Sequence, residues 1–143
     1  MGTLTPHLVV AGAAAAAKWY VDALGAVEEG RIPVPGGRLM QVALRFGDAT
    51  MMIADEFPEM GVLGPKSLGS PVALHLATDD VDATFERAVA MGATAKGEPA
   101  DMFWGERFAQ IVDPFGHRWN LARHIRDVPP DKIAAAAWKA FSG

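Results

Sequence analysis

The sequence runs twice through one pattern of predicted elements, and this repeat constrains the fold more than any other feature. Short matching stretches recur at nearly the same separation along the chain. The matched positions are His7 with His75, Gly25 with Gly92, and Gly47 with Gly116, which lie 68, 67 and 69 residues apart. Each match is weak by itself, because Gly-Ala pairs are common. Three matches in the same order, at one spacing, indicate a tandem duplicated module.

Each module predicts a strand, a helix and then three more strands. Strand-like runs with turn residues between them predict the strands, Gly25 ends the first helix, and the pair Asp79-Asp80 lies where the second helix needs an N-cap. The first module, residues 4–54, is expected to hold strands at 5–10, 27–33, 38–46 and 49–54 and a helix at 13–24. The second, residues 70–126, is expected to hold strands at 71–78, 94–100, 108–112 and 117–124 and a helix from 81. A loop at 55–69 joins the two modules.

A further helix is predicted at the end of the chain, over 129–142. It begins at the Pro129-Pro130-Asp131 stretch, and Ile133, Ala137 and Phe141 follow at helical spacing, with Trp138 beside them. A helix of this length needs a surface to dock on, either on its own domain or on a second subunit. We expect a homodimer, because one chain of two modules leaves apolar strand faces to cover, and this helix is a plausible strap across the subunits.

Composition excludes several classes of function. The chain of 143 residues has no cysteine, so disulfide scaffolds, cysteine-ligated metal centres and thiol nucleophiles are excluded. Its 13 Lys and Arg against 17 Asp and Glu give a net charge of −4, which disfavours nucleic acid as a partner. The first residues lack the basic flank of a signal peptide, and the longest apolar stretch, residues 8–17, is far shorter than a membrane span. We expect a cytoplasmic protein without a membrane partner.

Three stretches carry a resemblance to a known family: AAKWYVDALGA, DDVDATFERAVAMGA and FWGERFAQIVDPFGHRWNLA. With the repeat, they make residues 4–126 resemble the vicinal oxygen chelate superfamily of glyoxalases, bleomycin resistance proteins and extradiol dioxygenases. The last stretch resembles a subgroup described as demethylubiquinone methyltransferase-like. The resemblance implies an α+β fold in which two tandem βαβββ modules form a curved mixed sheet around a cavity. Residues 1–143 would then be one glyoxalase-like domain with a C-terminal helix.

The same resemblance implies where a metal would be held. Metal-dependent members take one ligand, His, Glu or sometimes Gln, from the first and fourth strands of each module. In this chain those positions fall on Thr5, Met52, Ala73 and Asn120. Their side chains do not supply the carboxylates and imidazoles that such a site requires. We therefore expect no metal cofactor, and a divalent metal is the alternative.

Two histidines lie two residues beyond those strand positions. A two-residue step along a strand returns to the same face, so His7 and His75 are expected to point into the cavity from equivalent strands. They are either a substrate-binding or acid/base pair, or a packed, hydrogen-bonded pair. In a shifted register they could ligate a metal, but carboxylates would have to join them, and Asp55 and Asn120 are the nearest options.

The remaining candidates surround the last two strands. Asn120 would orient a polar ligand, or is an ordinary strand residue. Trp104 would stack on a planar or cationic ligand, or caps the core. Arg107 would hold a carboxylate or phosphate, or pairs with Glu106 or Asp101. The predicted ligand-binding residues are therefore His7, Met52, His75, Trp104, Arg107 and Asn120. His117 and His124 are expected at the surface.

Three functions fit these observations. The first is a small-molecule-binding protein of the drug-resistance type without the usual metal-ligand set, and it is the function we predict. The second is a metal-dependent lyase or isomerase of the lactoylglutathione lyase type, which needs ligands that the sequence does not show. The third is a metal-independent enzyme that uses His7, His75 or Asn120. The sequence leaves both the ligand and the presence of catalysis open.

Overall fold

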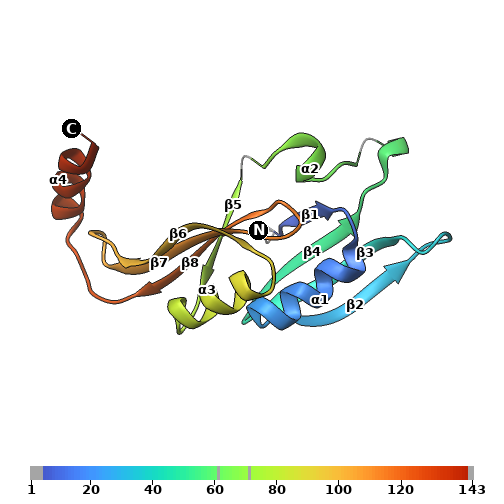
Figure 1. The fold of residues 1–143 in the computed structure, drawn as a ribbon, viewed down its shortest axis with the longest axis horizontal. Coiled ribbons are helices and arrows are strands. Elements are labelled where there is room, and N and C mark those ends of the chain that lie inside the picture. Colours follow the sequence, from blue (N-terminus) through green and yellow to red (C-terminus); the bar gives the residue numbers. More distant parts are fainter. Residues whose placement is uncertain (1–4, 61, 71, 142–143) are drawn as a thin grey trace, which may run out of the picture. The chain divides into compact units, whose positions relative to one another are not determined.

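A computed structural model describes residues 5–60, 62–70 and 72–141, and Figure 1 shows their α+β arrangement. The chain divides into two units. Unit 1 comprises residues 1–72 with the segment 113–117, and unit 2 comprises residues 73–112 and 118–143. Each unit contains one four-stranded mixed sheet and one main helix. The predicted α+β class, with two βαβββ modules and a C-terminal helix, is confirmed.

Unit 1 contains a strand, a helix and three strands, followed by two short helices. Its elements are β1 (His7–Val10), α1 (Ala13–Leu24), β2 (Val27–Pro33), β3 (Leu39–Phe46), β4 (Ala49–Asp55), η1 (Pro58–Met60) and α2 (Pro65–Leu68). The strand order is β1-β4-β3-β2, with β1 parallel to β4 and the other neighbours antiparallel. The helix α1 packs on one face of this sheet over a core that includes Tyr20, Val42, Leu44 and Ile53.

Unit 2 repeats this plan. Its elements are β5 (Ala73–Ala77), α3 (Val81–Ala90), β6 (Thr94–Asp101), β7 (Glu106–Val112), β8 (Arg118–His124) and α4 (Pro130–Phe141). The strand order is β5-β8-β7-β6, and only β5 and β8 are parallel. Of the predicted pair Asp79-Asp80, Asp80 caps α3, because its Oδ1 accepts a hydrogen bond of 3.0 Å from the Ala83 amide. Within α3, the side chains of Val81 and Phe85 are buried, whereas Val89, predicted on the packed side, is 37% exposed.

The duplication extends to irregular details of the backbone. Gly30 pairs with Ala43 and Gly97 pairs with Gln110, and in each case the strand register shifts just before the glycine. The turn that follows β2 and the turn that follows β6 close with the same hydrogen bonds. They run from the Val34 amide to the Arg38 carbonyl at 2.9 Å and from the Met102 amide to the Glu106 carbonyl at 2.8 Å. The internal repeat inferred from three short matches is therefore a repeat of whole modules.

The structure corrects several predicted boundaries. The first strand begins at His7 rather than at residue 5, and β7 begins at Glu106 rather than at residue 108. The segment 55–69, predicted as a loop, contains the short helices η1 and α2. Both are too short for a periodic apolar pattern, which explains why the sequence did not indicate them.

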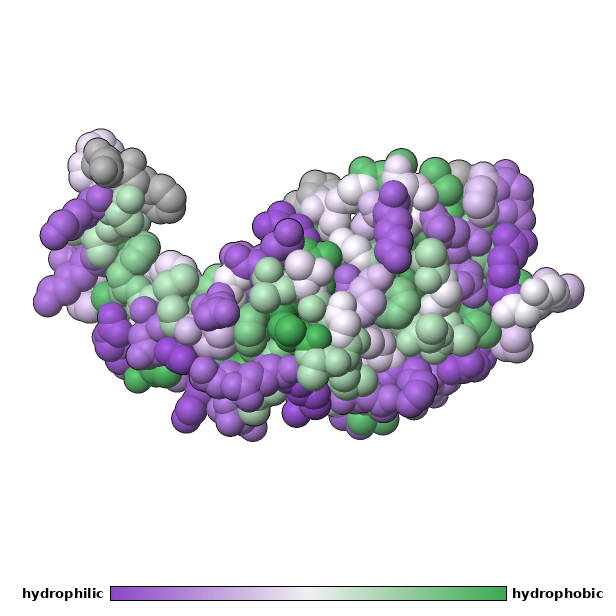
Figure 2. Space-filling model, in the orientation of Figure 1, coloured by the Kyte–Doolittle hydropathy of each residue, from purple (hydrophilic) through white to green (hydrophobic). Residues whose placement is uncertain are grey.

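The helix α4 makes no extended packing contact with any other element that the structure describes. Hydrophobic and hydrophilic residues lie on different sides of this helix (Figure 2). Trp138 is 78% exposed, and Ile133 is half-buried. The side chain of Phe141, the third residue of the predicted stripe, lies outside the described part of the structure. Among the described residues, no helix has the length and apolar character that crossing a membrane requires.

Candidate functional site

The sheet face that does not carry the main helix presents one row of side chains in each unit. In unit 1, His7 is the register partner of Met52, which pairs in turn with Ala43. In unit 2, His75 is the partner of Asn120, which pairs in turn with Gln110. Leu74 and Leu76 pair with the buried Trp119 and Leu121, so they lie on the opposite face from His75. The predicted alternation along β5 is confirmed.

A cavity of about 660 Å³ lies on this face of unit 1. Its walls come from β1, β3 and β4, from the turn after β2, and from the segment that follows β4. The lining residues are His7, Val9, Val34, Pro35, Arg38, Met40, Ala54, Phe57, Glu59 and Val62. Most of these side chains are apolar, and the polar ones are a histidine and an arginine with its glutamate. Of the six predicted ligand-binding residues, only His7 lines this cavity.

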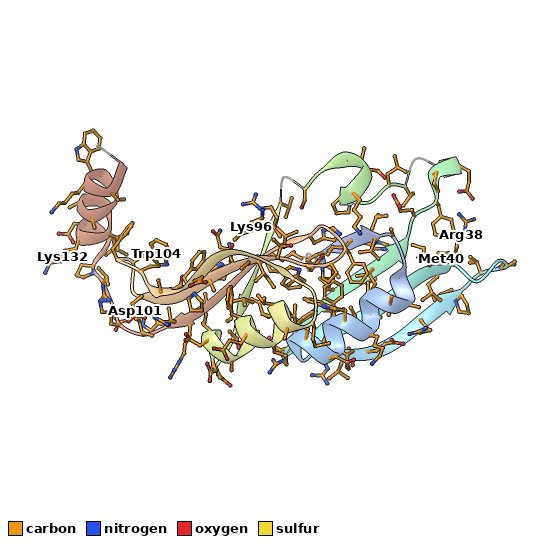
Figure 3. The ribbon with its side chains drawn as sticks, viewed as in Figure 1. Arg38, Met40, Lys96, Asp101, Trp104 and Lys132 are labelled. Atoms are coloured by element: carbon orange, nitrogen blue, oxygen red, sulfur yellow. The ribbon has the colours of Figure 1, made fainter. Side chains whose placement is uncertain are left out.

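Arg38, which is labelled in Figure 3, contacts both an acidic and an aromatic side chain of the cavity. Its Nη1 and Nη2 donate to the two carboxylate oxygens of Glu59 at 3.0 and 2.7 Å. Its guanidinium lies 4.1 Å from the centre of the Phe57 ring, a cation–π contact. The hydrogen bonds from Arg38 lower the pKa of Glu59 to about 2, so this carboxylate is ionised at neutral pH. The sequence does not indicate this cluster, because its members come from a turn and a loop without periodicity.

Two acidic residues fix the frame of the cavity. The carboxylate of Asp55, at the end of β4, accepts hydrogen bonds of 2.7 Å from the amides of Ala13 and Leu39. Glu56 Oε2 accepts bonds from the Gly64 amide at 2.8 Å and the Ser67 hydroxyl at 3.2 Å. Asp55 therefore ties the start of α1 and the start of β3 to β4. Glu56, which follows β4 directly, ties Gly64 and Ser67 to the end of that strand.

Unit 2 carries an aromatic and acidic cluster on the corresponding face. Trp104 Nε1 donates to Glu106 Oε1 at 2.7 Å, and the indole lies edge-on to Phe108 with ring centres 5.4 Å apart. His75 Nε2 is 3.8 Å from Glu106 Oε2, and its ring centre is 6.2 Å from that of Phe108. The structure therefore brings together the predicted residues His75 and Trp104 through Glu106, a residue predicted only as a pairing partner.

Asn120 lies in a smaller cavity of about 300 Å³ on unit 2, whose polar lining also includes Lys96, Gln110 and Arg118. Its Oδ1 accepts a hydrogen bond of 3.1 Å from Gln110 Nε2. The amide group of Asn120 is thus oriented by its cross-strand neighbour. Its predicted role in ligand binding stays a prediction.

Arg107 points its charge at α3 and at β6. Its Nε and Nη2 donate to the two oxygens of Asp82 at 3.0 and 2.8 Å, and its Nη1 donates to Asp101 at 3.2 Å. These hydrogen bonds lower the pKa of Asp82. The predicted pairing with Asp101 is confirmed, and Asp82 is a second partner. The ligand-binding role of Arg107 stays a prediction, with its guanidinium already bound to two carboxylates.

The two outlying histidines differ. His124 is exposed, as predicted, and lies 2.8 Å from Asp127. The prediction of an exposed His117 is wrong, because this residue is half-buried and its Nε2 lies 2.9 Å from the Val9 carbonyl oxygen. The neighbouring Asp113 accepts hydrogen bonds from the Phe115 and His117 amides, both at 2.9 Å. That carboxylate holds the turn in the geometry that brings the His117 ring to β1.

The positions that correspond to metal ligands in the family do not fit a metal ion. Met52 and Asn120 lie beside His7 and His75, but Thr5 and Ala73 supply no carboxylate or imidazole. Within 5–60, 62–70 and 72–141, no group of three or more His, Asp or Glu side chains is arranged to hold a metal. Asp55, the carboxylate nearest to His7 in the register, already accepts backbone hydrogen bonds with both oxygens.

Comparisons with known proteins agree with this fold. The Glyoxalase/Bleomycin resistance protein/Dioxygenase superfamily matches residues 3–121. Two uncharacterized mycobacterial proteins are 47% identical over 137 residues, Mb0911c of Mycobacterium bovis and Rv0887c of Mycobacterium tuberculosis. The match covers 93% of this chain, with 90% of the first and 81% of the second.

Several solved structures have a similar fold. A gene product of Arabidopsis thaliana is 27% identical, with a TM-score of 0.70 over 85% of this chain and 98% of that one. TioX from Micromonospora sp. ML1 is 24% identical, with a TM-score of 0.69 over 87% of this chain and 100% of its own. A putative 3-demethylubiquinone-9 3-methyltransferase, PhnB protein, from Bacillus cereus is 13% identical, with a TM-score of 0.67 over 85% and 99%. The last two likenesses show the fold alone.

Proposed function

The chain belongs to the Glyoxalase/Bleomycin resistance protein/Dioxygenase superfamily, and from this premise we propose that it binds a small, largely apolar organic molecule in the unit 1 cavity. The observation that carries the proposal is the cavity itself. Its volume of about 660 Å³ lies within the range of small-molecule sites, roughly 300–1,000 Å³. Its apolar walls with a few polar side chains have the composition of such sites.

The polar groups in the lining support the binding of a ligand rather than metal-assisted chemistry. His7 is the cavity's imidazole, and its register partner Met52 adds no oxygen or nitrogen donor. The acidic lining residue, Glu59, is bound to Arg38 through both oxygens. The proposed function therefore requires no metal ion in this cavity. The family's metal-dependent lyase or isomerase activity stays the alternative, to be judged by elemental analysis of the purified protein.

The unit 2 face stays part of the proposal as a second binding surface. His75, Trp104 and Asn120 lie there, with Glu106 and Phe108 between the first two. An oriented carboxylate next to an indole ring suits a polar group of a ligand. Binding measurements on variants of each unit decide which of the two sites takes a ligand.

The test uses 2-naphthalenemethanol, a neutral aromatic probe, and measures the melting temperature and the heat of binding. A ligand that binds only the native state raises the melting temperature. We expect the Met40→Asp variant to lose binding, because it places a charge in the apolar wall. Ile32→Asp is the matched control, since Ile32 is an equally apolar, exposed strand residue outside the lining. Equal binding to both variants and to the wild type would place the probe elsewhere and contradict the proposal.

We also propose that the protein is a homodimer, as its sequence predicts. The support is α4, a helix of 12 residues with an exposed Trp138 and no extended packing contact on the elements described. An isolated helix of that length is marginal in water, so a covering surface would stabilise it. Light scattering at micromolar concentration tests this, and a particle of 15.2 kDa would contradict it.

A further inference from the structure

The ion pair of Arg38 and Glu59 lies in the lining of an otherwise largely apolar cavity, whose stability does not require an ion pair. We infer that the ligand of the unit 1 cavity carries a carboxylate on an apolar body, and that this carboxylate replaces Glu59 on the guanidinium of Arg38. The inference rests on the proposed function and adds the substrate class to it. Three observations support it: Arg38 is held in place by other contacts, Glu59 can leave Arg38, and the other polar lining residues are basic.

Arg38 is the fixed partner. Besides Glu59, its guanidinium contacts the Phe57 ring at 4.1 Å, and its Nη1 lies 3.4 Å from the Glu56 carbonyl oxygen. Its own carbonyl closes the turn after β2 by accepting from the Val34 amide at 2.9 Å. The next residue, Leu39, is held by Asp55 through its amide. The position and the direction of the Arg38 side chain are therefore set by contacts that do not involve Glu59.

Glu59 is the exchangeable partner. It lies in the three-residue helix η1, and its side chain is 56% exposed against 40% for Arg38. Ion pairs that are this exposed contribute little to folding, so an incoming carboxylate can take the place of Glu59 at small cost. The guanidinium offers two parallel N–H donors, and a ligand carboxylate fits them with the same two-point geometry.

The remaining lining decides the sign of the ligand's charge. Among the lining residues that the structure describes, Glu59 is the single acidic side chain, whereas Arg38 and His7 are both basic. A cationic ligand would have to draw Glu59 away from Arg38. The positive charge of the ligand would then lie near the guanidinium of Arg38, which would have lost its Glu59 partner. An anionic ligand leaves Glu59 in water and keeps Arg38 paired. The apolar lining residues, which include Val9 and Val62, then cover the body of the ligand.

The experiment compares three probes with one aromatic body: 2-naphthoate, 2-naphthalenemethanol and 2-naphthylmethylammonium. Isothermal titration at neutral pH is expected to show 2-naphthoate binding about tenfold more tightly than the neutral probe, the usual size of a charge-assisted contact. Arg38→Gln is expected to remove that preference, so that 2-naphthoate binds no more tightly than the neutral probe. Glu59→Gln is expected to tighten 2-naphthoate about threefold to tenfold, because no internal carboxylate competes with it.

The matched controls are Arg31→Gln and Glu28→Gln. Arg31 and Glu28 form an equally short, two-point exposed pair on β2, outside the cavity lining. These variants change the net charge in the same way and are expected to leave all three affinities unchanged. Melting curves of all four variants verify that each one is folded.

The outcomes separate the two proposals. Equal binding of 2-naphthoate and the neutral probe, or an Arg38→Gln variant that weakens both by one factor, would overturn the anionic ligand and leave the cavity function intact. Tighter binding of the ammonium probe, strengthened by Arg38→Gln, would overturn it in favour of a cation at Glu59. Failure of every probe to bind the wild-type protein would overturn the cavity function together with the inference.

Discussion

The two units share one backbone and differ in the chemistry of the sheet face that lies opposite the helix. His7 and His75 occupy the same position, but the next side chain is Met52 in unit 1 and Asn120 in unit 2. The residue that closes the equivalent turn is Arg38 in unit 1 and Glu106 in unit 2. Arg38 is bound to a glutamate and Glu106 to an indole N–H. A duplicated frame thus holds two faces with opposite charge at one equivalent position.

The comparison shows which features the fold requires. The glycine at the strand irregularity, the hydrogen bonds of the turn and the parallel pairing of the first and last strands recur in both units. The side chains on the open face do not recur, apart from the histidine. Packing beneath the helix and backbone conformation therefore determine the module, and the open face is available for function.

The largest expected effect breaks a feature that only unit 1 has. Asp113 is 3% exposed and accepts hydrogen bonds from the Tyr20 hydroxyl at 2.6 Å and from the Phe115 and His117 amides. The chain has a single tyrosine, so unit 2 cannot form this bond with a tyrosine hydroxyl. Asp113→Ala is expected to lower the free energy of unfolding by about 4 kcal/mol, because three donors lose a charged acceptor.

Urea denaturation measures that change. Asp48→Ala, at the exposed turn between β3 and β4, is the control and is expected to stay within about 0.5 kcal/mol of the wild type. A loss below about 1 kcal/mol in Asp113→Ala would mean that the buried network is not what ties α1 to the turn at 113–117.

The second prediction uses a glycine that both units have. Gly37 and Gly105 lie at equivalent turn positions with φ of 85° and 97°, a region that favours glycine. A Cβ at Gly105 would lie 2.2 Å from the Arg126 carbonyl oxygen, whereas nothing lies within 4 Å of one at Gly37. Gly37→Ala is expected to destabilise by about 1 kcal/mol from backbone strain, and Gly105→Ala by about 3 kcal/mol from strain and clash.

The difference between these two alanine variants is the measured quantity, by urea or thermal unfolding. Similar losses would indicate that the segment around Arg126 moves aside easily. The packing of the residues that lead from β8 to α4 would then not depend on Gly105.

The third prediction concerns pH. Burial, and then the neighbouring Asp113, raise the pKa of Tyr20 well above its ordinary value of 10.0. A group whose pKa is higher in the folded state stabilises the fold below its unfolded pKa and loses that contribution as the pH rises. The free energy of unfolding should therefore fall above about pH 10, and Tyr20→Phe should remove this part of the fall.

Tyr20 is the one tyrosine of the chain, so the comparison isolates a single group. At neutral pH, Tyr20→Phe is expected to cost about 1 kcal/mol, the contribution of one hydrogen bond. Parallel curves for the two proteins up to pH 11 would show that the hydroxyl is not the group that titrates.

The module plan could be predicted from the sequence because its signals are local. Gly25 and Asp80 mark helix ends, and alternation along 73–76 placed His75 opposite Leu74 and Leu76. The family resemblance gave the expected α+β fold. The ends of β1 and β7 were misplaced by two residues, since strand ends depend on partners that lie far away in the sequence.

The candidate site was harder to predict. His7 was found because its position follows from strand alternation. Arg38, Phe57 and Glu59 were missed, because they come from a turn and a loop that meet only in the folded chain. Arg107 carried the residue type of an anion site, but its partners Asp82 and Asp101 lie on a helix and on a neighbouring strand. Charge pairing of this kind is decided by tertiary structure.

The fourth prediction tests how tolerant the open faces are. Asn120→Leu removes the acceptor of Gln110 Nε2 and is expected to cost about 1 kcal/mol, because that amide is half-buried. Met52→Leu, at the equivalent position of unit 1, conserves volume and is expected to cost about 0.5 kcal/mol. Thermal unfolding measures both. Equal losses would indicate that the amide pair of unit 2 contributes nothing beyond packing.

The smallest expected effects come from the two histidines, and they separate the two faces by function. His75 has a side chain that is 49% exposed, and His7 is also exposed. We therefore expect His7→Ala and His75→Ala each to change the free energy of unfolding by less than about 0.5 kcal/mol.

Titration of these two variants with 2-naphthoate then measures ligand binding without a folding defect. Because His7 lines the unit 1 cavity and His75 does not, His7→Ala should weaken binding severalfold and His75→Ala should not. If His75→Ala alone weakens binding, the ligand uses the face with Glu106 and Trp104. If His75→Ala instead loses folding and keeps its binding per folded molecule, His75 is a structural residue of unit 2.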